Sequence, residues 1–499
     1  MNKQLLRLSV VSMVLLAILV VATTYWQSWA VAGLQDRQDN AIQQVAQLSI
    51  ARGAIVGANG TDFALNTKRR VKGQTFFKRR YPQHGLAAQL VGYSTQGGTR
   101  VGLEKSLNDY LTGANTNLSN AVQRELDELG GATVHGNKLV LTLKPAVQRL
   151  ALRELDGRCG AVVALNPHTG EVYAMASSPT YDQNLIEKPG GYAKILKIKG
   201  ACGDASALVN NATAGLYTPG STFKLVTAAA ALDTGTFTPD SRFQDPGYCV
   251  EYGKKVYNAG NPDQNGPEAF GSTTLAVGLQ HSINSVFCNV GMKLGAKTIL
   301  EYTKRFGFYS TPPLETPADE RAPSGLYDLS HGRSHLYWPK DFNAVDPGRL
   351  AFGQERMLAT PLQMALVAAT IANGGVVPRP YLVQRIVGPD GSVVSSTRTQ
   401  TLGRAIKAET ARELTQMMVS VVQGGTGTQA QIPGIQVAGK TGTAETAVNH
   451  VYNAWFVSFA PADNPRVAVA VVVEKQLNGF GGSVAAPIAK DVLEALLHG

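Results

Sequence analysis

The stretch Val467-Ala468-Val469-Ala470-Val471-Val472-Val473 decides the predicted fold. A strand of this sequence is apolar on both faces, so both faces must be covered, and it belongs inside a sheet rather than at its edge. Residues 454–460 form a second apolar segment. The turn-forming sequence Pro461-Ala462-Asp463-Asn464-Pro465 joins the two segments, which predicts an antiparallel pair.

A hairpin and several helices complete this predicted domain. Residues 161–165 and 171–176 flank turn chemistry at Asn166-Pro167-His168-Thr169-Gly170. Helical patterns occupy residues 221–232, 359–373, 409–422 and 485–497. Strands at both ends with helices between them predict an α+β fold, an antiparallel sheet with helices packed on it, over residues 150–499.

Composition limits the kinds of function that remain. The chain has 499 residues, of which 44% are hydrophobic and 16% charged, so a disordered chain is excluded. The 46 basic residues outnumber the 36 acidic ones, and the net charge of +10 suits nucleic acid, phospholipid or an acidic wall polymer. The eight histidines are scattered, without HExxH or CxxC, so no metal and no other cofactor is predicted.

The N-terminus chooses among these partners. Twenty-eight uncharged residues separate Arg7 from Asp36, and residues 8–29 are predicted to form a transmembrane anchor. Lys3 and Arg7 precede the anchor, so the tail 1–7 is expected in the cytoplasm and the rest outside the plasma membrane. A chain that lies mostly outside the membrane makes nucleic acid a poor partner for the basic surplus.

Two features follow the apolar segment. Trp26 and Trp29 are expected at the outer membrane interface, where amphipathic rings are favoured. Ala30-Val31-Ala32 resembles a signal-peptidase site, so cleavage is the alternative to an anchor. The long apolar core favours the uncleaved anchor.

Residues 33–145 are predicted to form one small module. It begins with a polar helix over 33–50, continues with short strands and turns after Arg52, and contains a short helix over 103–111 that ends at Gly113. Residues 68–80 hold seven basic side chains and no acid: Lys68, Arg69, Arg70, Lys72, Lys78, Arg79 and Arg80. A solvated face is the ordinary interpretation of this run, and contact with anionic lipid or polymer outside the cell is the functional one.

The segment Tyr217-Thr218-Pro219-Gly220-Ser221-Thr222-Phe223-Lys224 could carry chemistry. Ser221 and Lys224 share a face of the first helical turn. A serine hydroxyl becomes a nucleophile when a base takes its proton, and a lysine in that role must be neutral, with a pKa lowered by burial or by a nearby cation. Alone, the pair more often represents a capping serine and a solvated lysine.

Two further motifs are weak when taken singly. The sequence Ser282-Ile283-Asn284 is typical of a helix start with a capping serine. Lys440-Thr441-Gly442-Thr443 fits an edge strand whose glycine lets a substrate backbone approach closely. Lys440 would supply positive charge for a carboxylate and would lower the pKa of Lys224.

The three motifs in this order are those of penicillin-binding proteins and class A β-lactamases. Over nearly its whole length the sequence resembles the class B penicillin-binding proteins, the monofunctional peptidoglycan D,D-transpeptidases, and above all the actinobacterial PbpA-type enzymes. The other segments that carry the resemblance are Arg52-Gly53-x-Ile55, Tyr81-Pro82, Ala88 to Tyr93, Gly102-Leu103-Glu104, Thr360 to Ala365, Ile371 to Gly375 and Val422 to Gly427. The resemblance implies a dimerisation or pedestal module at 33–145, followed by a transpeptidase domain like that of serine D,D-peptidases and β-lactamases.

The resemblance also implies a nucleophile and its helpers. Ser221 would attack the carbonyl of the penultimate D-alanine of a peptidoglycan stem peptide, and Lys224 would accept its proton. Ser282 would relay a proton to the leaving amine, while Asn284 would bind the substrate amide and position Lys224. A second stem peptide would then attack the acyl-enzyme, and β-lactams would acylate the same serine.

The third motif would bind the substrate. Lys440 and Thr441 would hold its terminal carboxylate, with Gly442 giving access. The backbone N–H groups of Ser221 and Thr443 would form the oxyanion hole.

Two departures and one missing segment qualify the resemblance. Ile283 stands where β-lactamases have Asp, which favours a penicillin-binding protein. Glu355 follows Gly353-Gln354 where the family often has Gly, so an altered turn is expected there. No transglycosylase segment is recognised, which implies a SEDS-type glycosyltransferase partner within a septal or an elongation complex.

Two alternatives remain open at this point. A β-lactam-sensing receptor or a β-lactamase would keep Ser221 and Lys224, although no ExxxN segment for deacylation is evident between Ser282 and Lys440. A catalytically silent divisome scaffold would have no need of these motifs.

The four cysteines allow three disulfide pairings, and spacing does not choose among them. Cys249 precedes the Ser282 motif, and Cys288 lies about one and a half helical turns beyond Ser282. Our hypothesis pairs Cys249 with Cys288 and Cys159 with Cys202.

Overall fold

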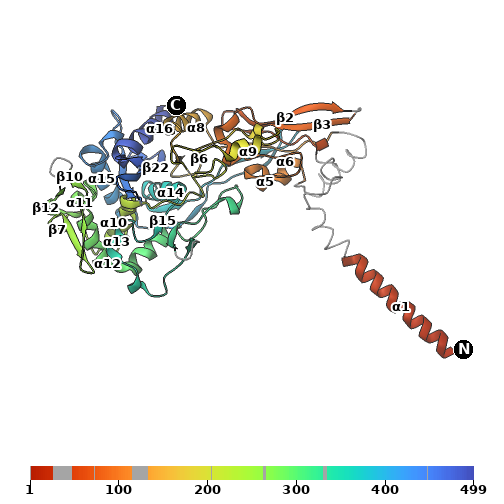
Figure 1. Ribbon diagram of the computed structural model, residues 1–499, viewed down its shortest axis with the longest axis horizontal. Coiled ribbons are helices and arrows are strands. Elements are labelled where there is room, and N and C mark those ends of the chain that lie inside the picture. Colours follow the sequence, from red (N-terminus) through yellow and green to blue (C-terminus); the bar gives the residue numbers. More distant parts are fainter. Residues whose placement is uncertain are drawn as a thin grey trace.

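The structure is a computed structural model, which describes residues 2–25, 48–71, 74–114, 133–203, 205–261, 266–329, 334–446 and 448–498. The described residues form an apolar N-terminal helix, a six-stranded sheet and a larger α+β domain (Figure 1).

The larger domain is organised around a five-stranded antiparallel sheet with the order β20-β21-β22-β5-β6. The strands are β5 (Gly160–Leu165), β6 (Val172–Ser178), β20 (Ala438–Glu445), β21 (Val451–Ala460) and β22 (Val467–Leu477). The predicted hairpin and the predicted C-terminal strand pair are therefore both confirmed. β22 lies at the centre, and β20 forms one edge.

Strand β22 is covered on both faces, as its sequence predicts. Val467, Val469, Val471 and Val473 pack into a cluster with α8 (Pro145–Leu155) and α16 (Ala486–His498). The intervening residues of the strand pack into the main core with α14 (Pro361–Ala372): Ala468, Ala470 and Val472. Each buried valine stabilises the fold by roughly 1.5–3 kcal/mol, so the sheet is held from both sides.

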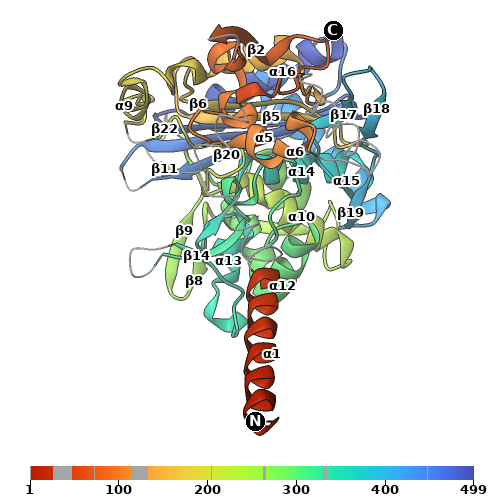
Figure 2. The ribbon, with the colours of Figure 1, turned by 90° about the vertical axis from the view of Figure 1, so that its right-hand side faces the viewer.

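Further helices and short two- and three-stranded ribbons complete the larger domain. The helices are α9 (Gly191–Leu196), α10 (Lys224–Asp233), α11 (Leu275–Gln280), α12 (Asn284–Arg305), α13 (Pro347–Ala351) and α15 (Ala408–Gly424). The paired short strands are β7 (Arg242–Asp245) with β12 (Gly271–Thr274), β8 (Tyr248–Glu251) with β9 (Lys254–Tyr257), β10 (Gly260–Asn261) with β11 (Gly266–Pro267), β13 (Gly325–Asp328) with β14 (His335–Leu336) and β15 (Met357–Leu358), and β16 (Val376–Pro378) with β19 (Thr401–Arg404). Every residue of α10 is buried, because its alanines let neighbouring helices approach closely. Figure 2 shows α10 and α12 on one side of the sheet.

The six-stranded sheet joins distant parts of the chain in the order β18-β17-β4-β1-β2-β3. Its strands are β1 (Ile55–Val56), β2 (Asp62–Val71), β3 (Gln74–Arg80), β4 (Lys138–Leu141), β17 (Val383–Val387) and β18 (Val393–Ser396). The last two strands come from the range predicted as the transpeptidase domain. The predicted module at 33–145 thus shares its sheet with the later part of the chain.

Short helices pack beside this sheet. They are α4 (Ala88–Val91), α5 (Gly102–Ser106) and α6 (Asn108–Thr112). The helix predicted over 103–111 is therefore interrupted at Leu107, whereas Gly113 caps its end in the left-handed conformation, as predicted, with a φ of 72°.

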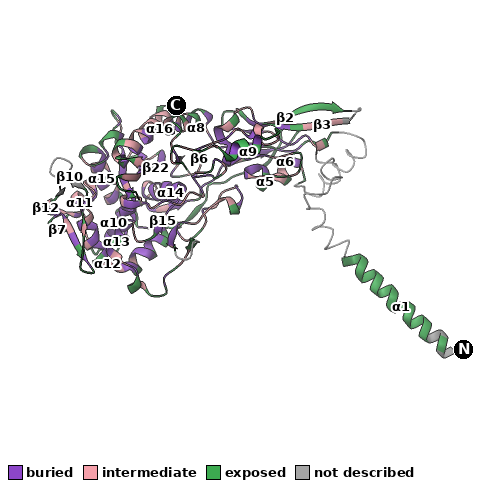
Figure 3. Ribbon diagram, viewed as in Figure 1, coloured by how far each residue is buried: buried purple, intermediate pink, exposed green. Residues whose placement is uncertain are grey.

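Helix α1 (Asn2–Tyr25) fits the predicted anchor. Residues 7–25 are long and apolar enough to cross a membrane, and their apolar side chains are exposed (Figure 3). Trp26, Trp29, the Ala30-Val31-Ala32 sequence and most of the helix predicted over 33–50 lie outside the described residues.

The four cysteines form two disulfides. Cys159 is joined to Cys202, and Cys249 to Cys288, which is the pairing that the sequence analysis proposed. The second bond ties β8 to α12.

Candidate active site

A tight turn presents Ser221. The serine lies in a 3-10 turn (η4, Gly220–Phe223) that leads directly into α10. Gly220 has a φ of +51°, and its N–H donates to Gly353 O at 3.2 Å. A Cβ on Gly353 would lie 2.3 Å from Gly220 O, so glycine is required there. The turn leaves Ser221 half-buried at the end of the helix.

Strand β21 contacts the segment that leads into this turn. Trp455 Nε1 donates to Thr218 O at 3.1 Å, and the ring of Tyr217 packs edge-on against Trp455. Tyr217 OH donates to Glu474 Oε1 at 2.5 Å. These contacts fix the approach to Ser221, and the sequence analysis assigned none of the three side chains to the site.

Lys224 lies at the centre of a group of neutral oxygens. Its side chain is fully buried, and Nζ donates to Ser282 O at 2.7 Å and to Asn284 Oδ1 at 2.8 Å. Ser282 Oγ lies 3.3 Å from the same nitrogen. The structure therefore brings together the first two predicted motifs.

Ser282 is not the helix cap that the sequence favours by default. Ile283 occupies the N-cap position of α12, and Ser282 has a φ of +60°. A left-handed backbone is costly for a serine. The conformation places both Ser282 O and Ser282 Oγ beside Lys224.

A buried network holds the start of α12. Asp245 Oδ1 accepts from Ser285 Oγ at 2.6 Å, and Asn258 Oδ1 accepts from Ser285 N at 2.9 Å. Asn284 Nδ2 donates to Tyr257 O at 3.0 Å. Asp245 and Asn258 carry no motif that would reveal them in the sequence, although they position the residue next to Asn284.

Strand β20 brings the second lysine to the site. Lys440 is fully buried on this edge strand, and its Nζ donates to Thr441 O at 3.0 Å. Burial lowers the pKa of Lys440 to about 7. Burial, and then the positive charge of Lys440, hold the pKa of Lys224 well below its ordinary value. Lys224 is therefore suited to accept a proton.

The remaining residues of the third motif face neighbouring loops. Thr441 Oγ1 lies 2.6 Å from Thr426 Oγ1, and Thr443 Oγ1 accepts from Gly481 N at 3.3 Å. A Cβ on Gly442 would lie 2.8 Å from the Thr222 methyl carbon, so a glycine lets β20 approach the turn that carries Ser221. Thr426 lies in one of the segments that carried the resemblance, which was the available signal for it.

Glu355, where the sequence predicts an altered turn, lies in unusual backbone. Glu355 and Arg356 have φ values of 39° and 59°. A glycine would adopt this region without a steric penalty, whereas glutamate does not.

This geometry suits one reaction class. A half-buried hydroxyl begins a helix, a buried lysine with a lowered pKa lies one turn further on, and an edge strand with a second lysine runs beside them. Such a group can attack a carbonyl carbon and hold the acyl group on serine. The fold and the site thus define a serine acyl-transfer protein.

Comparison with known proteins gives the family. Residues 160–494 match the penicillin binding protein transpeptidase domain, and residues 52–139 match the penicillin binding protein A dimerisation domain. The chain belongs to the class B penicillin-binding proteins.

Full-length relatives support this assignment. The chain is 33% identical to the peptidoglycan D,D-transpeptidase PbpA of Mycolicibacterium smegmatis, covering 100% of this chain and 99% of the relative. It is 34% identical to PbpA of Mycobacterium tuberculosis strain H37Rv, covering 100% of both chains. The ceftriaxone acyl-enzyme of penicillin-binding protein A from M. tuberculosis superposes with a TM-score of 0.78 at 32% identity, over 91% of this chain and 100% of that one.

Proposed function

We propose that the protein is a peptidoglycan D,D-transpeptidase that forms its acyl-enzyme on Ser221. The observation that carries the proposal is the fully buried Lys224, whose Nζ contacts both Ser282 and Asn284 and whose pKa is lowered. The full-length similarity to PbpA enzymes and to β-lactam acyl-enzymes supports the same function.

The acylation step uses the first two motifs. Ser221 Oγ attacks the carbonyl carbon of the penultimate D-alanine as Lys224 Nζ takes the hydroxyl proton. The C–N bond to the terminal D-alanine breaks, and the amine leaves with a proton passed from Lys224 through Ser282 Oγ. Asn284 holds the side chain of Lys224 and offers its amide to the substrate.

The third motif binds the substrate end. The charge of Lys440 and the hydroxyl of Thr441 hold the terminal carboxylate, which in turn favours the protonated lysine. The N–H groups of Ser221 and Thr443 stabilise the oxyanion. The amine of a second stem peptide then attacks the ester carbonyl, forms the cross-link and returns a proton to Ser221.

The N-terminal part has a supporting role in this proposal. Lys3 and Arg7 keep the N-terminus in the cytoplasm, α1 anchors the chain, and the catalytic domain lies outside the plasma membrane. The module at 33–145 serves as a pedestal or dimerisation unit. A SEDS-type glycosyltransferase of a septal or elongation complex supplies the glycan strands.

A mass-spectrometric time course of the full-length protein with benzylpenicillin tests this function. We expect a long-lived adduct on the peptide that contains Ser221 and none in Ser221→Ala. A donor stem peptide ending in D-Ala-D-Ala, offered with an acceptor amine, should then yield a cross-linked product and free D-alanine.

Other outcomes would separate the alternatives. A transient adduct with hydrolysed drug would indicate a β-lactamase. A stable adduct without cross-linking would indicate a sensor, and the lack of any adduct on a folded sample would indicate a scaffold.

A further inference from the structure

The strands β2 and β3 extend beyond the rest of their sheet as a two-stranded ribbon. β1 reaches β2 at Asp62 and Ala64, whereas β3 pairs with β2 from Leu65 to Val71. The distal residues 67–71 of β2 are all exposed (Figure 3). The catalytic steps proposed above do not use this hairpin.

The exposed part of the hairpin carries charge of one sign. Its exposed cations lie on both faces of the ribbon: Lys68, Arg69, Arg70, Lys78 and Arg80. Phe77 lies opposite Lys68 and Phe76 opposite Arg69, and both rings are half-buried. Asp62, at the base of β2, is the one acid in residues 62–80. An edge strand needs charge to prevent pairing with another chain, but it does not need a single sign.

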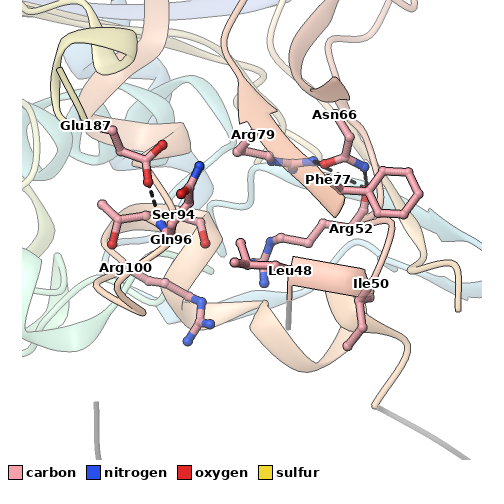
Figure 4. A pocket seen from close by; sticks show the side chains of 11 residues that line it. Leu48, Ile50, Arg52, Asn66, Phe77, Arg79, Ser94, Gln96, Arg100 and Glu187 are labelled. Carbon is pink, nitrogen blue, oxygen red and sulfur yellow. Dashed lines mark hydrogen bonds between the residues drawn. The ribbon is translucent and has the colours of Figure 1, made fainter. Parts of the chain in front are cut away.

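Arg79 differs from its neighbours in the basic run. Its side chain is 3% exposed and turns inward, where Nε donates to Glu104 Oε1. Arg79 and Phe77 line one pocket with Leu48, the first described residue after α1 (Figure 4). The chain therefore enters this module beside the base of the hairpin.

The anchor keeps the hairpin within reach of a bilayer. Twenty-two residues separate Tyr25 from Leu48, and a chain of that length spans at most ~75 Å. A tether of this kind raises the local concentration of the hairpin at the surface, so weak charge contacts suffice to hold it there.

We propose that the β2–β3 hairpin docks on the phosphate-bearing headgroups of the anionic bilayer that holds α1. Lysine and arginine are attracted to anionic leaflets, by roughly fivefold in affinity for each residue. Phenylalanine and the methylene stems of the cations suit the boundary between headgroups and acyl chains. Docking would hold the six-stranded sheet close to the membrane and the transpeptidase domain away from it.

Fluorescence quenching of the full-length protein in nanodiscs tests the proposal. The two native disulfides together use all four cysteines. Val71→Cys therefore supplies a single free thiol for an environment-sensitive dye. We expect strong quenching by a headgroup nitroxide lipid when phosphatidylglycerol is present. Quenching should be weak in pure phosphatidylcholine and in high salt, which shortens the Debye length from about 8 Å to about 3 Å.

Charge removal sharpens the test. The labelled triple variant Lys68→Gln, Arg69→Gln, Arg70→Gln loses three cations, so surface occupancy should fall by about a hundredfold. A matched triple on α12, at the opposite end of the molecule (Figure 1), should leave quenching unchanged: Lys293→Gln, Lys297→Gln and Lys304→Gln. A dye at Ser396→Cys, on the opposite edge strand β18, should be quenched little.

Three results would overturn the proposal. The first is equal quenching in both lipids, and the second is quenching that survives the hairpin triple. The third is protection of the dye by purified anionic wall polymer without any dependence on lipid, which would make the hairpin a polymer-binding surface. Benzylpenicillin acylation in every variant confirms that the protein is folded, because none of these residues belongs to the active site.

Discussion

Two of the places where the described residues bury charge arrange it in opposite ways. In the six-stranded sheet, Glu104 lies fully buried between Arg52 and Arg79, at 2.9 Å and 2.5 Å. Burial alone would raise the pKa of Glu104, but the two guanidinium groups outweigh it and lower that pKa. In the active site, the fully buried Lys224 and Lys440 both have lowered pKa values.

The difference separates structural burial from reactive burial. The two guanidinium groups keep the Glu104 carboxylate ionised, so the cluster joins α5 to β3 without chemical reactivity. Burial lowers the pKa of both lysines, and the charge of Lys440 lowers that of Lys224 further, so the site gains a base. Substitutions in the two places should separate structural burial from reactive burial, with the largest effect at Lys224.

Lys224→Arg should abolish the base while keeping a long cation. Arginine stays protonated, so it is not able to take the proton of Ser221, and acylation by benzylpenicillin should slow by about 10²–10⁴-fold. Stopped-flow acylation kinetics measure the effect. A rate within tenfold of the native protein would contradict the assignment of Lys224 as the base.

Glu104→Gln should destabilise the fold rather than the chemistry. Loss of the carboxylate leaves two buried arginines without their partner, which costs about 3–5 kcal/mol. Denaturant unfolding in detergent measures the loss of stability. At low denaturant, where the variant is folded, its rate of acylation by benzylpenicillin should equal that of the native protein. The matched control is Asp319→Asn, which breaks the exposed Lys105–Asp319 pair and should cost less than about 1 kcal/mol.

Lys440→Met should change how stability depends on pH. The native lysine has a pKa of about 7 against an ordinary 10.5, so the unfolded chain binds more protons between those values. The free energy of unfolding of the native protein therefore falls as pH drops from 10.5 to 7. Denaturant unfolding at pH 7 and pH 10 measures this difference, and the free energy of unfolding of the variant should fall less between pH 10 and pH 7. An equal fall in both proteins would refute the lowered pKa of Lys440.

Glu355→Gly should stabilise the protein slightly. Glycine adopts the positive φ of this position freely, so the free energy of unfolding should rise by about 1 kcal/mol. Gln354→Gly, at a neighbouring position without a positive φ, should instead lower it by about 0.5–1 kcal/mol. Thermal unfolding of both variants provides the comparison, and equal shifts would show that the turn is unstrained.

Much of the larger domain could be predicted from local pattern. The apolar run at 467–473 fixes a central strand because both of its faces must be buried, and the helices follow from apolar spacing. The order of the three motifs predicts which side chains meet at the site, since Lys224 does contact Ser282 and Asn284.

Long-range partners could not be read in the same way. The addition of β17 and β18 to the N-terminal sheet, and the contact of Asp245 with Ser285, join segments whose own sequences do not identify each other. The sequence predicts one common role for all the basic side chains of residues 68–80, whereas strand alternation turns Arg79 inward to Glu104. The left-handed backbone of Ser282 also has no local signal, because it is imposed by its neighbours.

The central claim is that burial, together with the charge of Lys440, lowers the pKa of Lys224 far enough for its amine to act as the base. The most direct test is the pH dependence of Ser221 acylation by benzylpenicillin in the native protein and in Lys440→Met. The account predicts a native rate that reaches its plateau well below pH 10.5, and an acid limb that moves to higher pH in the variant because the charge of Lys440 is lost. A native rate that keeps rising until the ordinary lysine pKa of 10.5 would contradict it.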